Sequence, residues 1–482
     1  MSFEPIIGLE VHVQLNTNTK MFCSCSSNYL DVEPNTYVCN ICLGLPGSLP
    51  SVNHEAVISA IKLGLSLNCK ISRLTKFDRK NYVYPDLMKG YQISQLDFPI
   101  AIEGMMKVKN IENKVSDIRI NRVHMEEDVA KLIHDEISGE VLVDLNRSGM
   151  PLLEVVTEPD FRSATEAENY LTNLQAIVRY LGIGNANMEE GSFRCDANVS
   201  IRKTGTDVLN EKVEIKNMNR IKAVARAIEY EIKRQTSEVE AGNRIIQETR
   251  GWDDIKSESK PQRSKEDAHD YRYFPEPDLP VIKLKTETIE KIKNELPELP
   301  EEKFDRYVKK IGISEYDAKI IISNKSKTTF FEDVLNNFKK MDPNLVSNWL
   351  NVEINGVSNS LKDYELEKMK LSSKNFGKLI NLVSENQINK NSGKEILSKI
   401  YITDEDPNEL VDKMGLKSMN NKQDLIVMVS EVLLENKSAI EDYLRGKENA
   451  VRFLIGQVMK KSRGTANPSD TEEEITRQLN EQ

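Results

Sequence analysis

Four cysteines near the N-terminus have the spacing of a metal site. A CxC pair and a CxxC pair, thirteen residues apart, are formed by Cys23, Cys25, Cys39 and Cys42. Two such pairs in a short loop can converge on one ion, and four soft thiolates with no open position favour structural zinc. Four reduced thiols that never meet, or an iron–sulfur cluster, are the alternatives. The total of six cysteines in 482 residues is too low for a disulfide framework.

Carboxylates and basic side chains alternate with apolar residues in four segments that we predict to be strands. The segments are 6–15, 151–156, 193–202 and 212–216. A period of two places their apolar residues on one face of a sheet and their polar residues on the other. The polar face then carries Glu10, His12, Glu154, Asp196 and Glu214. Carboxylates interleaved with histidine, arginine and lysine are suited to Mg²⁺ and phosphate, although a plain solvated face shows the same alternation.

Two further segments add candidate site residues. The segment 122–131 places three consecutive acids, 126–128, shortly after a histidine. A cation would relieve their mutual repulsion, and a solvated acidic turn is the alternative. Alternation does not decide whether Glu126 and Asp128, or Glu127, face the site. The segment 76–85 contains three cations and three aromatic residues, a composition suited to stacking a base and holding phosphate, or to a surface hairpin.

The composition limits the class of protein. Lys and Arg total 66 against 76 Asp and Glu, a formal net charge of −10. No stretch approaches the ~20 consecutive apolar residues of a membrane span, and the N-terminus lacks the basic region of a secretory signal, so we expect a cytoplasmic protein. The acidic balance argues against binding nucleic acid through bulk charge, though not through a local basic patch. The motifs GxxxxGK[ST] and GxGxxG and the kinase HRD and DFG motifs are absent.

The chain divides by composition into a strand-rich part and a helical part. Roughly the first 290 residues contain all the cysteines and histidines, whereas the rest has helical spacing apart from a strand-like run near 348–357. Prolines at 294–300 indicate a linker, and a second break falls near 403–407. We therefore predict an α+β protein. Its expected domains are an antiparallel-sheet domain over 1–293, an all-α domain over 294–405 and a small α-helical tail over 406–482.

Seven segments, in this order, resemble one protein family. They are IIGLEVHVQL at 6–15, KFDRKNY at 76–82, HMEED at 124–128, LVDLNRSGMPLLEVVTEPD at 142–160, MEEGSFRCDANVSIR at 188–202, QETRGWDD at 247–254 and DYRYFPEPDLP at 270–280. Along essentially its full length the chain is similar to the B subunits (GatB) of the aspartyl/glutamyl-tRNA amidotransferases. Seven stretches in one order are far more specific than any single motif.

The resemblance implies a function and an architecture. The family converts glutamate misattached to tRNA(Gln), or aspartate misattached to tRNA(Asn), into the cognate amide. Its B subunit uses ATP and Mg²⁺ to phosphorylate the side-chain carboxylate, the A subunit releases ammonia from glutamine, and the C subunit holds the other two together. The B subunit is expected to consist of a cradle domain with the kinase site, a helical domain and a YqeY-like tail that contacts tRNA.

The resemblance also implies roles for individual residues. The magnesium ligands that it implies are Glu10, His12, Glu127, Glu154, Asp196 and Glu214, with Glu10 and His12 also expected to be catalytic. Glu127 rests on the resemblance alone. Lys80 and Arg79 are expected to contact ATP or the acyl phosphate, and the four cysteines match a structural zinc knuckle at 23–42 that some family members have.

The tail offers a small basic cluster for a local contact with tRNA, namely Lys460, Lys461 and Arg463. A solvated helix end is the alternative for these three residues. For the whole chain, a non-catalytic tRNA-binding scaffold of the same complex is the alternative function. A class I glutaminyl- or glutamyl-tRNA synthetase is disfavoured because the nucleotide-binding signatures of that class are absent.

Overall fold

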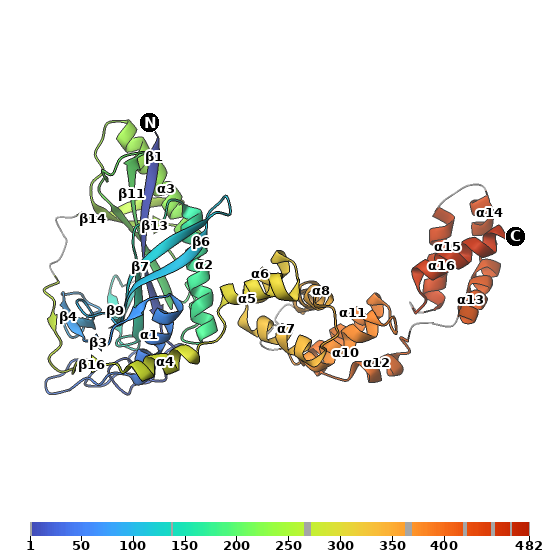
Figure 1. Cartoon of the computed structure of the whole chain (residues 1–482), viewed down its shortest axis with the longest axis horizontal. Helices are drawn as coiled ribbons and strands as arrows, with labels where there is room; N and C mark the ends of the chain where they lie inside the picture. The colour runs from blue at the N-terminus through green and yellow to red at the C-terminus, as the bar shows by residue number, and fades with distance from the viewer. Residues whose placement is uncertain are drawn as a thin grey trace. The chain divides into compact units, whose positions relative to one another are not determined.

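A computed structural model describes residues 2–135, 138–264, 271–361, 369–417, 422–444, 449–462 and 465–481. The chain forms two compact units, Met1–Pro300 and Glu301–Gln482. The first unit contains the strands and four of the described helices, and the second unit is helical (Figure 1). The α+β class predicted from the sequence is confirmed.

A nine-stranded sheet organises the first unit. Its order is β14-β13-β12-β11-β1-β10-β7-β6-β2. The strands are β1 (Phe3–Gln14), β2 (Lys70–Ile71), β6 (Ala101–Lys109), β7 (Val115–Glu127), β10 (Pro151–Thr157), β11 (Phe193–Lys203), β12 (Val213–Lys216), β13 (Glu248–Asp253) and β14 (Glu258–Ser264). All four segments predicted as strands are therefore strands of one sheet.

One pair of neighbouring strands in this sheet departs from the predicted antiparallel arrangement. β12 and β13 pair in parallel, whereas the other neighbours in the sheet are antiparallel. The connection between them contains the helix α3 (Ile221–Glu240). A helix-containing crossover is what a parallel pair requires, because a tight hairpin can join only antiparallel strands.

Helices cover the apolar face of the sheet. Val11 on β1 and Ala197 on β11 are fully buried on this face. They share one hydrophobic core with α1 (His54–Ser66), α2 (Ala164–Leu181) and α3, which lie along the sheet in Figure 1. Side-chain caps begin two of these helices, since Asn53 and Ser163 each accept a hydrogen bond from a first-turn N–H group. The opposite, polar face carries the candidate site.

Three small sheets lie beside the large one. The strands are β15 (Phe274–Pro275), β4 (Asp78–Asn81) and β5 (Tyr91–Ser94) in the first, β16 (Ile282–Lys283) and β3 (Leu74–Thr75) in the second, and β8 (Lys131–His134) and β9 (Val141–Asp144) in the third. The first unit then continues into α4 (Thr286–Asn294). Ile292, Leu296 and Leu299 all pack against the core of this unit, so the proline-containing segment 294–300 belongs with the sheet.

The second unit consists of short helices. They are α5 (Pro300–Arg306), α6 (Glu315–Ile322), α7 (Lys325–Asn337), α8 (Pro343–Asn348), α9 (Asn355–Ser360), α10 (Ser373–Ser384), α11 (Lys390–Thr403), α12 (Pro407–Met414), α13 (Lys422–Glu435), α14 (Lys437–Leu444), α15 (Asn449–Lys461) and α16 (Pro468–Asn480). The last four share a hydrophobic cluster that includes Val429, Leu454 and Ile475. In the described part of the chain, no helix is both long and apolar enough to cross a membrane.

The strand-like run near 348–357 is helical, and that prediction was wrong. Trp349–Ile354 forms a π-helical segment between α8 and α9, and a second one occupies Tyr307–Ile311. Trp349, Leu350 and Ile354 are almost completely buried. The large apolar side chains of this run are buried within the helical unit, and this burial outweighs intrinsic strand propensity.

Candidate active site

The register of the central strands lines up polar residues across the sheet. His12 on β1 lies opposite Arg194 on β11 and opposite Glu154 on β10. Glu154 in turn lies opposite His124 on β7. Residues that face each other directly in an antiparallel pair point to the same side of the sheet. These four side chains therefore form a row on the polar face.

His12 and Glu154 of this row, together with Glu126 on β7, form a group that we call the His12 cluster. Nε2 of His12 lies 3.5 Å from Oε1 of Glu126 and 3.5 Å from Oε2 of Glu154. One ligand atom from each residue lies within 4.8 Å of the other two. Burial alone would raise the pKa of Glu154, but His124 and His12 lower it well below its usual value. Two ionised carboxylates beside a histidine fit a divalent cation that takes oxygen and nitrogen donors.

A second acidic group adjoins the His12 cluster. Asp196 lies opposite Glu10, and Glu214 lies opposite Asn198, whose Nδ2 donates to Oε1 of Glu10 over 2.9 Å. Nζ of Lys216 is 2.7 Å from Asp196 and 3.1 Å from Glu214. Burial and the nearby carboxylates together raise the pKa of Glu10. The three carboxylates of this group carry more negative charge than Lys216 alone neutralises, and a bound cation would reduce their mutual repulsion.

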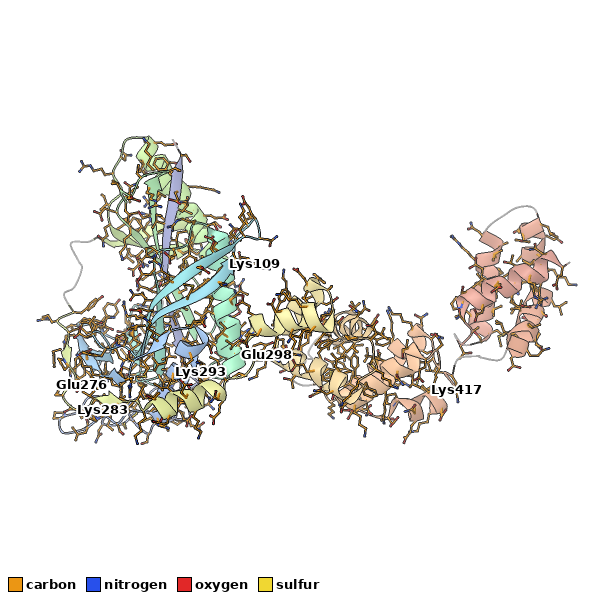
Figure 2. All side chains as sticks on the ribbon, viewed as in Figure 1. Lys109, Glu276, Lys283, Lys293, Glu298 and Lys417 are labelled. Atoms are coloured by element: carbon orange, nitrogen blue, oxygen red, sulfur yellow. The ribbon has the colours of Figure 1, made fainter. Side chains whose placement is uncertain are left out.

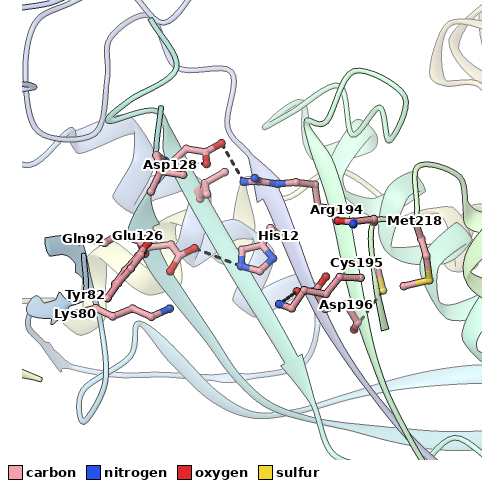
Figure 3. Close-up of a pocket in the computed structure, with 14 residues that line it drawn as sticks. His12, Lys80, Tyr82, Gln92, Glu126, Asp128, Arg194, Cys195, Asp196 and Met218 are labelled. Atoms are coloured by element: carbon pink, nitrogen blue, oxygen red, sulfur yellow. Dashed lines mark hydrogen bonds and ion pairs between the residues drawn. The ribbon is translucent and has the colours of Figure 1, made fainter. Parts of the chain in front are cut away.

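A cavity of about 330 Å³ opens above the polar face (Figure 3). Its charged and polar lining residues are His12, Lys80, Tyr82, Gln92, Glu126, Asp128, Arg194, Asp196, Lys216 and Asn217. At one end, Nη2 of Arg194 donates to Oδ2 of the buried Asp128 over 3.0 Å. The mixture of carboxylates and cations is that of a site that handles phosphate together with a metal ion.

Lys80 brings a positive charge into this cavity. It lies opposite Gln92 in the small sheet, and its Nζ is 4.9 Å from the centre of the Tyr271 ring and 6.0 Å from that of Tyr82. Within the described ranges, no carboxylate lies within 4.0 Å of this ammonium group. Burial alone would lower the pKa of Lys80, but Glu126 and other neighbouring groups raise it, so the side chain is charged. An ammonium group without its own counter-ion is suited to a phosphate oxygen.

Arg79 does not reach the cavity, contrary to the sequence prediction. Its Nε and Nη2 donate to the two carboxylate oxygens of Glu276 over 2.7 and 2.9 Å, and Nη2 also reaches Asp278 over 3.1 Å. Glu276 is labelled among the side chains in Figure 2. Its guanidinium lies 4.2 Å from the centre of the Tyr91 ring. Adjacent residues of a strand point to opposite faces, so Lys80 and Arg79 cannot both face the site. Arg79 holds the small sheet to the loop after β15.

Glu127 does not join the His12 cluster either. It lies opposite Pro151, on the other side of β7 from Glu126. Its Oε1 accepts a hydrogen bond from the backbone N–H of Ile93 over 2.9 Å and forms an ion pair with Lys89. The structure therefore replaces Glu127 by Glu126 in the set of candidate metal ligands. The alternation left this choice open, and the register decides it.

The four N-terminal cysteines come together, as the spacing predicts. Sγ of Cys42 is 3.2 Å from Cys23, 3.6 Å from Cys39 and 3.8 Å from Cys25. A tetrahedral zinc ion with Zn–S bonds of about 2.3 Å requires sulfur–sulfur distances of about 3.8 Å, so the set fits zinc. All six cysteines are free thiols. The alternative of thiols that never meet is excluded, and the residues are compatible with a zinc site.

A buried lysine supports the cysteine cluster. Lys20 is fully buried, and its Nζ lies 3.8 Å from Sγ of Cys42 and donates to the carbonyls of Tyr37 and Leu145 over 2.7 and 3.2 Å. Hydrogen bonding from Cys23, together with this ammonium group, lowers the pKa of Cys42 to about 4. A thiolate is the form that binds metal.

The basic cluster of the tail is only partly in the described chain. Lys460 and Lys461 are exposed at the end of α15, whereas Arg463 lies outside the described residues. Lys461 forms ion pairs of 2.9 Å with Glu431 and Glu435 on α13. Lys460 therefore offers the more available charge of the two.

Sequence reasoning assigned no role to several residues that line the cavity. Arg194 and Lys216 share the polar faces already recognised, so the alternation contained the signal for both. Asp128 was named only as an alternative to Glu127. Tyr271 is not among the lining residues but packs against Lys80, and no local pattern predicts this contact.

Comparison with known proteins gives the same picture along the whole chain. The family model described as the GatB/GatE catalytic domain matches residues 5–290, and the one described as the GatB domain matches residues 329–479. The B subunit of the aspartyl/glutamyl-tRNA(Asn/Gln) amidotransferase of Dehalococcoides mccartyi is 46% identical over 489 residues, covering 99% of each chain. The chain belongs to this family of amidotransferase B subunits.

Two further relatives show how evenly the similarity extends. The B subunit of Thermoanaerobacter pseudethanolicus is 44% identical over 479 residues, and that of Thermotoga maritima is 43% identical over 483 residues. Each alignment covers 99% of this chain. The chain is accordingly an enzyme subunit of the tRNA amidotransferase family, and the family resemblance inferred from seven segments is confirmed.

Proposed function

We propose that this chain activates the side-chain carboxylate of Glu-tRNA(Gln), Asp-tRNA(Asn) or both by phosphorylation with ATP. The relatives are named as the B subunit of an aspartyl/glutamyl-tRNA(Asn/Gln) amidotransferase, which supports an assembly of several subunits acting on tRNA. In this proposal, the A subunit supplies ammonia from glutamine and the C subunit completes the complex. The product is Gln-tRNA(Gln) or Asn-tRNA(Asn).

The observation that carries the proposal is that His12 and Glu126 line one cavity together with Lys80, with Glu154 directly beside His12. A free carboxylate is a poor acyl donor to ammonia because an oxide ion is a very poor leaving group. Attack of the carboxylate oxygen on the γ-phosphorus of ATP releases ADP and forms an acyl phosphate. Ammonia then attacks the acyl carbon, and phosphate leaves. The first step needs groups that neutralise charge on the transferred phosphoryl group.

The side chains have separable roles in this proposal. Glu126, Glu154 and His12 would hold Mg²⁺, with Glu10, Asp196 and Glu214 as the neighbouring acidic set. When bound, Mg²⁺ neutralises phosphate charge and orients ATP. The ammonium group of Lys80 donates to a phosphoryl oxygen.

The remaining assignments concern zinc and tRNA. The four cysteines are proposed to hold structural zinc at 23–42. Lys460, Lys461 and Arg463 are proposed to contact tRNA. They would form a local positive patch on a chain whose net charge is negative.

The test measures amide formation on Glu-tRNA(Gln) by this chain co-purified with its A and C partners, with and without ATP. Glu154→Gln keeps the size of the side chain but removes its charge. We expect it to lower ATP-dependent amide formation by about 100-fold or more, while glutamine hydrolysis by the A partner persists. Glu112→Gln, at an exposed site near the β6–β7 turn, is the matched control and should leave both reactions unchanged.

The alternative is a tRNA-binding scaffold that takes no part in the chemistry. It predicts that Glu154→Gln forms the amide at the rate of the unmodified complex. That outcome, obtained with normal tRNA binding, would remove the kinase site from this chain.

A further inference from the structure

His124 is a buried histidine that lies behind the His12 cluster. It stands on β7, directly opposite Glu154 on β10, and is only 4% exposed. Its Nε2 is 2.9 Å from Oε2 of Glu154 and 3.7 Å from Oε2 of Glu126. His12, by contrast, lines the cavity, and His124 is not among its lining residues. The position of His124 thus requires an explanation other than direct contact with substrate.

The contacts of His124 show that its Nε2 carries a proton. At 2.9 Å, Nε2 is within hydrogen-bond distance of a carboxylate oxygen, which can only accept when ionised. Nδ1 is buried and has no hydrogen-bond partner in the described part of the chain. An ionised carboxylate at this distance requires a donor, so Nε2 carries a proton and donates to Glu154.

Each carboxylate of the His12 cluster receives a hydrogen bond from a buried donor. Oε2 of Glu126 accepts a hydrogen bond from Oγ of the buried Ser94 over 3.3 Å, and its other oxygen faces His12. Glu154 receives its hydrogen bond from His124 on Oε2, the same oxygen that faces His12. Donors of this kind restrict the rotation of a ligating carboxylate, and their loss typically weakens metal binding without removing a ligand.

We propose that His124 is a positioning residue, which donates from Nε2 to Glu154 and fixes the carboxylate in the orientation that binds the divalent cation. This inference rests on the proposed metal site. A purely structural role, in which the ring only fills space between β7 and β10, predicts dependence on side-chain volume alone. A role as a further metal ligand predicts a second nitrogen bound directly to the metal.

The experiment titrates the intact complex with Mn²⁺ and follows free Mn²⁺ by electron paramagnetic resonance. In His124→Gln the amide nitrogen occupies the place of Nε2, whereas in His124→Asn it is one methylene shorter, and His124→Leu has no donor. We expect His124→Gln to bind Mn²⁺ nearly as tightly as the unmodified chain. His124→Asn and His124→Leu should bind it about 10- to 100-fold more weakly.

Each outcome separates this inference from the metal site on which it rests. Equal weakening by all three substitutions, or unchanged binding by His124→Leu, would overturn the role of His124 while leaving the site intact. Mn²⁺ binding that Glu154→Gln does not alter would overturn the site and the inference together. Electron spin-echo modulation of Mn²⁺ in the unmodified complex tests, without any variant, whether His124 is itself a metal ligand. One bound imidazole nitrogen, from His12, is expected, and two would make His124 a ligand.

Discussion

Lys80 and Arg79 are neighbours in the sequence, but Lys80 lines the cavity and Arg79 forms a structural ion pair. Both were predicted to contact ATP or the acyl phosphate, and both lie in a segment that combines cations with aromatic rings. The strand β4 separates them, since its alternation directs Lys80 into the cavity and Arg79 toward Glu276. Glu276 is only 3% exposed, so Arg79 satisfies a buried carboxylate. Composition predicted the presence of a basic site, and only the pairing of β4 with β15 and β5 assigns the two charges.

This difference predicts opposite effects of the same substitution at the two positions. Lys80→Met removes an ammonium group that has no described counter-ion, so it should lower amide formation by about 100-fold while the melting temperature changes little. Arg79→Met leaves Glu276 buried without its partner, which costs about 3–5 kcal/mol of stability. Thermal unfolding of both variants, measured beside amide formation, checks the contrast.

An equal loss of activity in the two variants, with unchanged melting temperatures, would contradict the structural role of Arg79. Arg79 would then act in the site, and its ion pair with Glu276 would have to open during the reaction.

Among the carboxylates, the sequence predicted the shared face but not every member. The alternation in segments 6–15 and 193–202 correctly placed Glu10, His12 and Asp196 on the polar side of their strands. Three consecutive acids at the end of β7 carry no alternation that distinguishes Glu126 from Glu127. That choice depends on Leu152 lying opposite Glu126, a contact between distant parts of the chain.

At the scale of elements, the cysteine knuckle is the part of the site region that local spacing predicted best. The CxC and CxxC pairs each bring two sulfurs together through a short turn, and the loop between them allows the two pairs to meet. The contact with Lys20 was not predictable in this way, since it also involves the carbonyl of Leu145. The π-helical run Trp349–Ile354 is the opposite case, in which burial overrode a local strand signal.

The knuckle gives a prediction about metal content. Freshly purified, reduced protein should contain about one equivalent of zinc, because four thiolates and no other donor complete a closed tetrahedral site. Cys39→Ser should lower the zinc content well below one equivalent, whereas Cys69→Ala, at an isolated buried cysteine, should retain it. Elemental analysis of the three proteins gives the answer directly. Full retention of zinc by Cys39→Ser would show that the ion is held elsewhere.

At the scale of the whole molecule, the division into units can be tested by truncation. We predicted that the first domain ends at 293, whereas the compact unit extends to Pro300. Leu296 and Leu299 pack against its core and would be lost at the earlier boundary. A fragment 1–300 should therefore be more stable than a fragment 1–293 by about 1–3 kcal/mol, the value of burying such side chains. Chemical denaturation of the two fragments measures this difference, and identical curves would support the earlier boundary.

The order of strands in the large sheet has a consequence for synthesis on the ribosome. β1 is made first, yet its two neighbours, β10 and β11, begin only at Pro151 and Phe193. At roughly 5–20 residues per second, the apolar side of β1 waits about 7–30 s before either neighbour exists. During that interval the nascent chain exposes a strand rich in isoleucine, leucine and valine with both edges unpaired, a feature that promotes aggregation. We therefore expect correct folding to depend on a chaperone that protects the N-terminal strand while the rest of the sheet is being made.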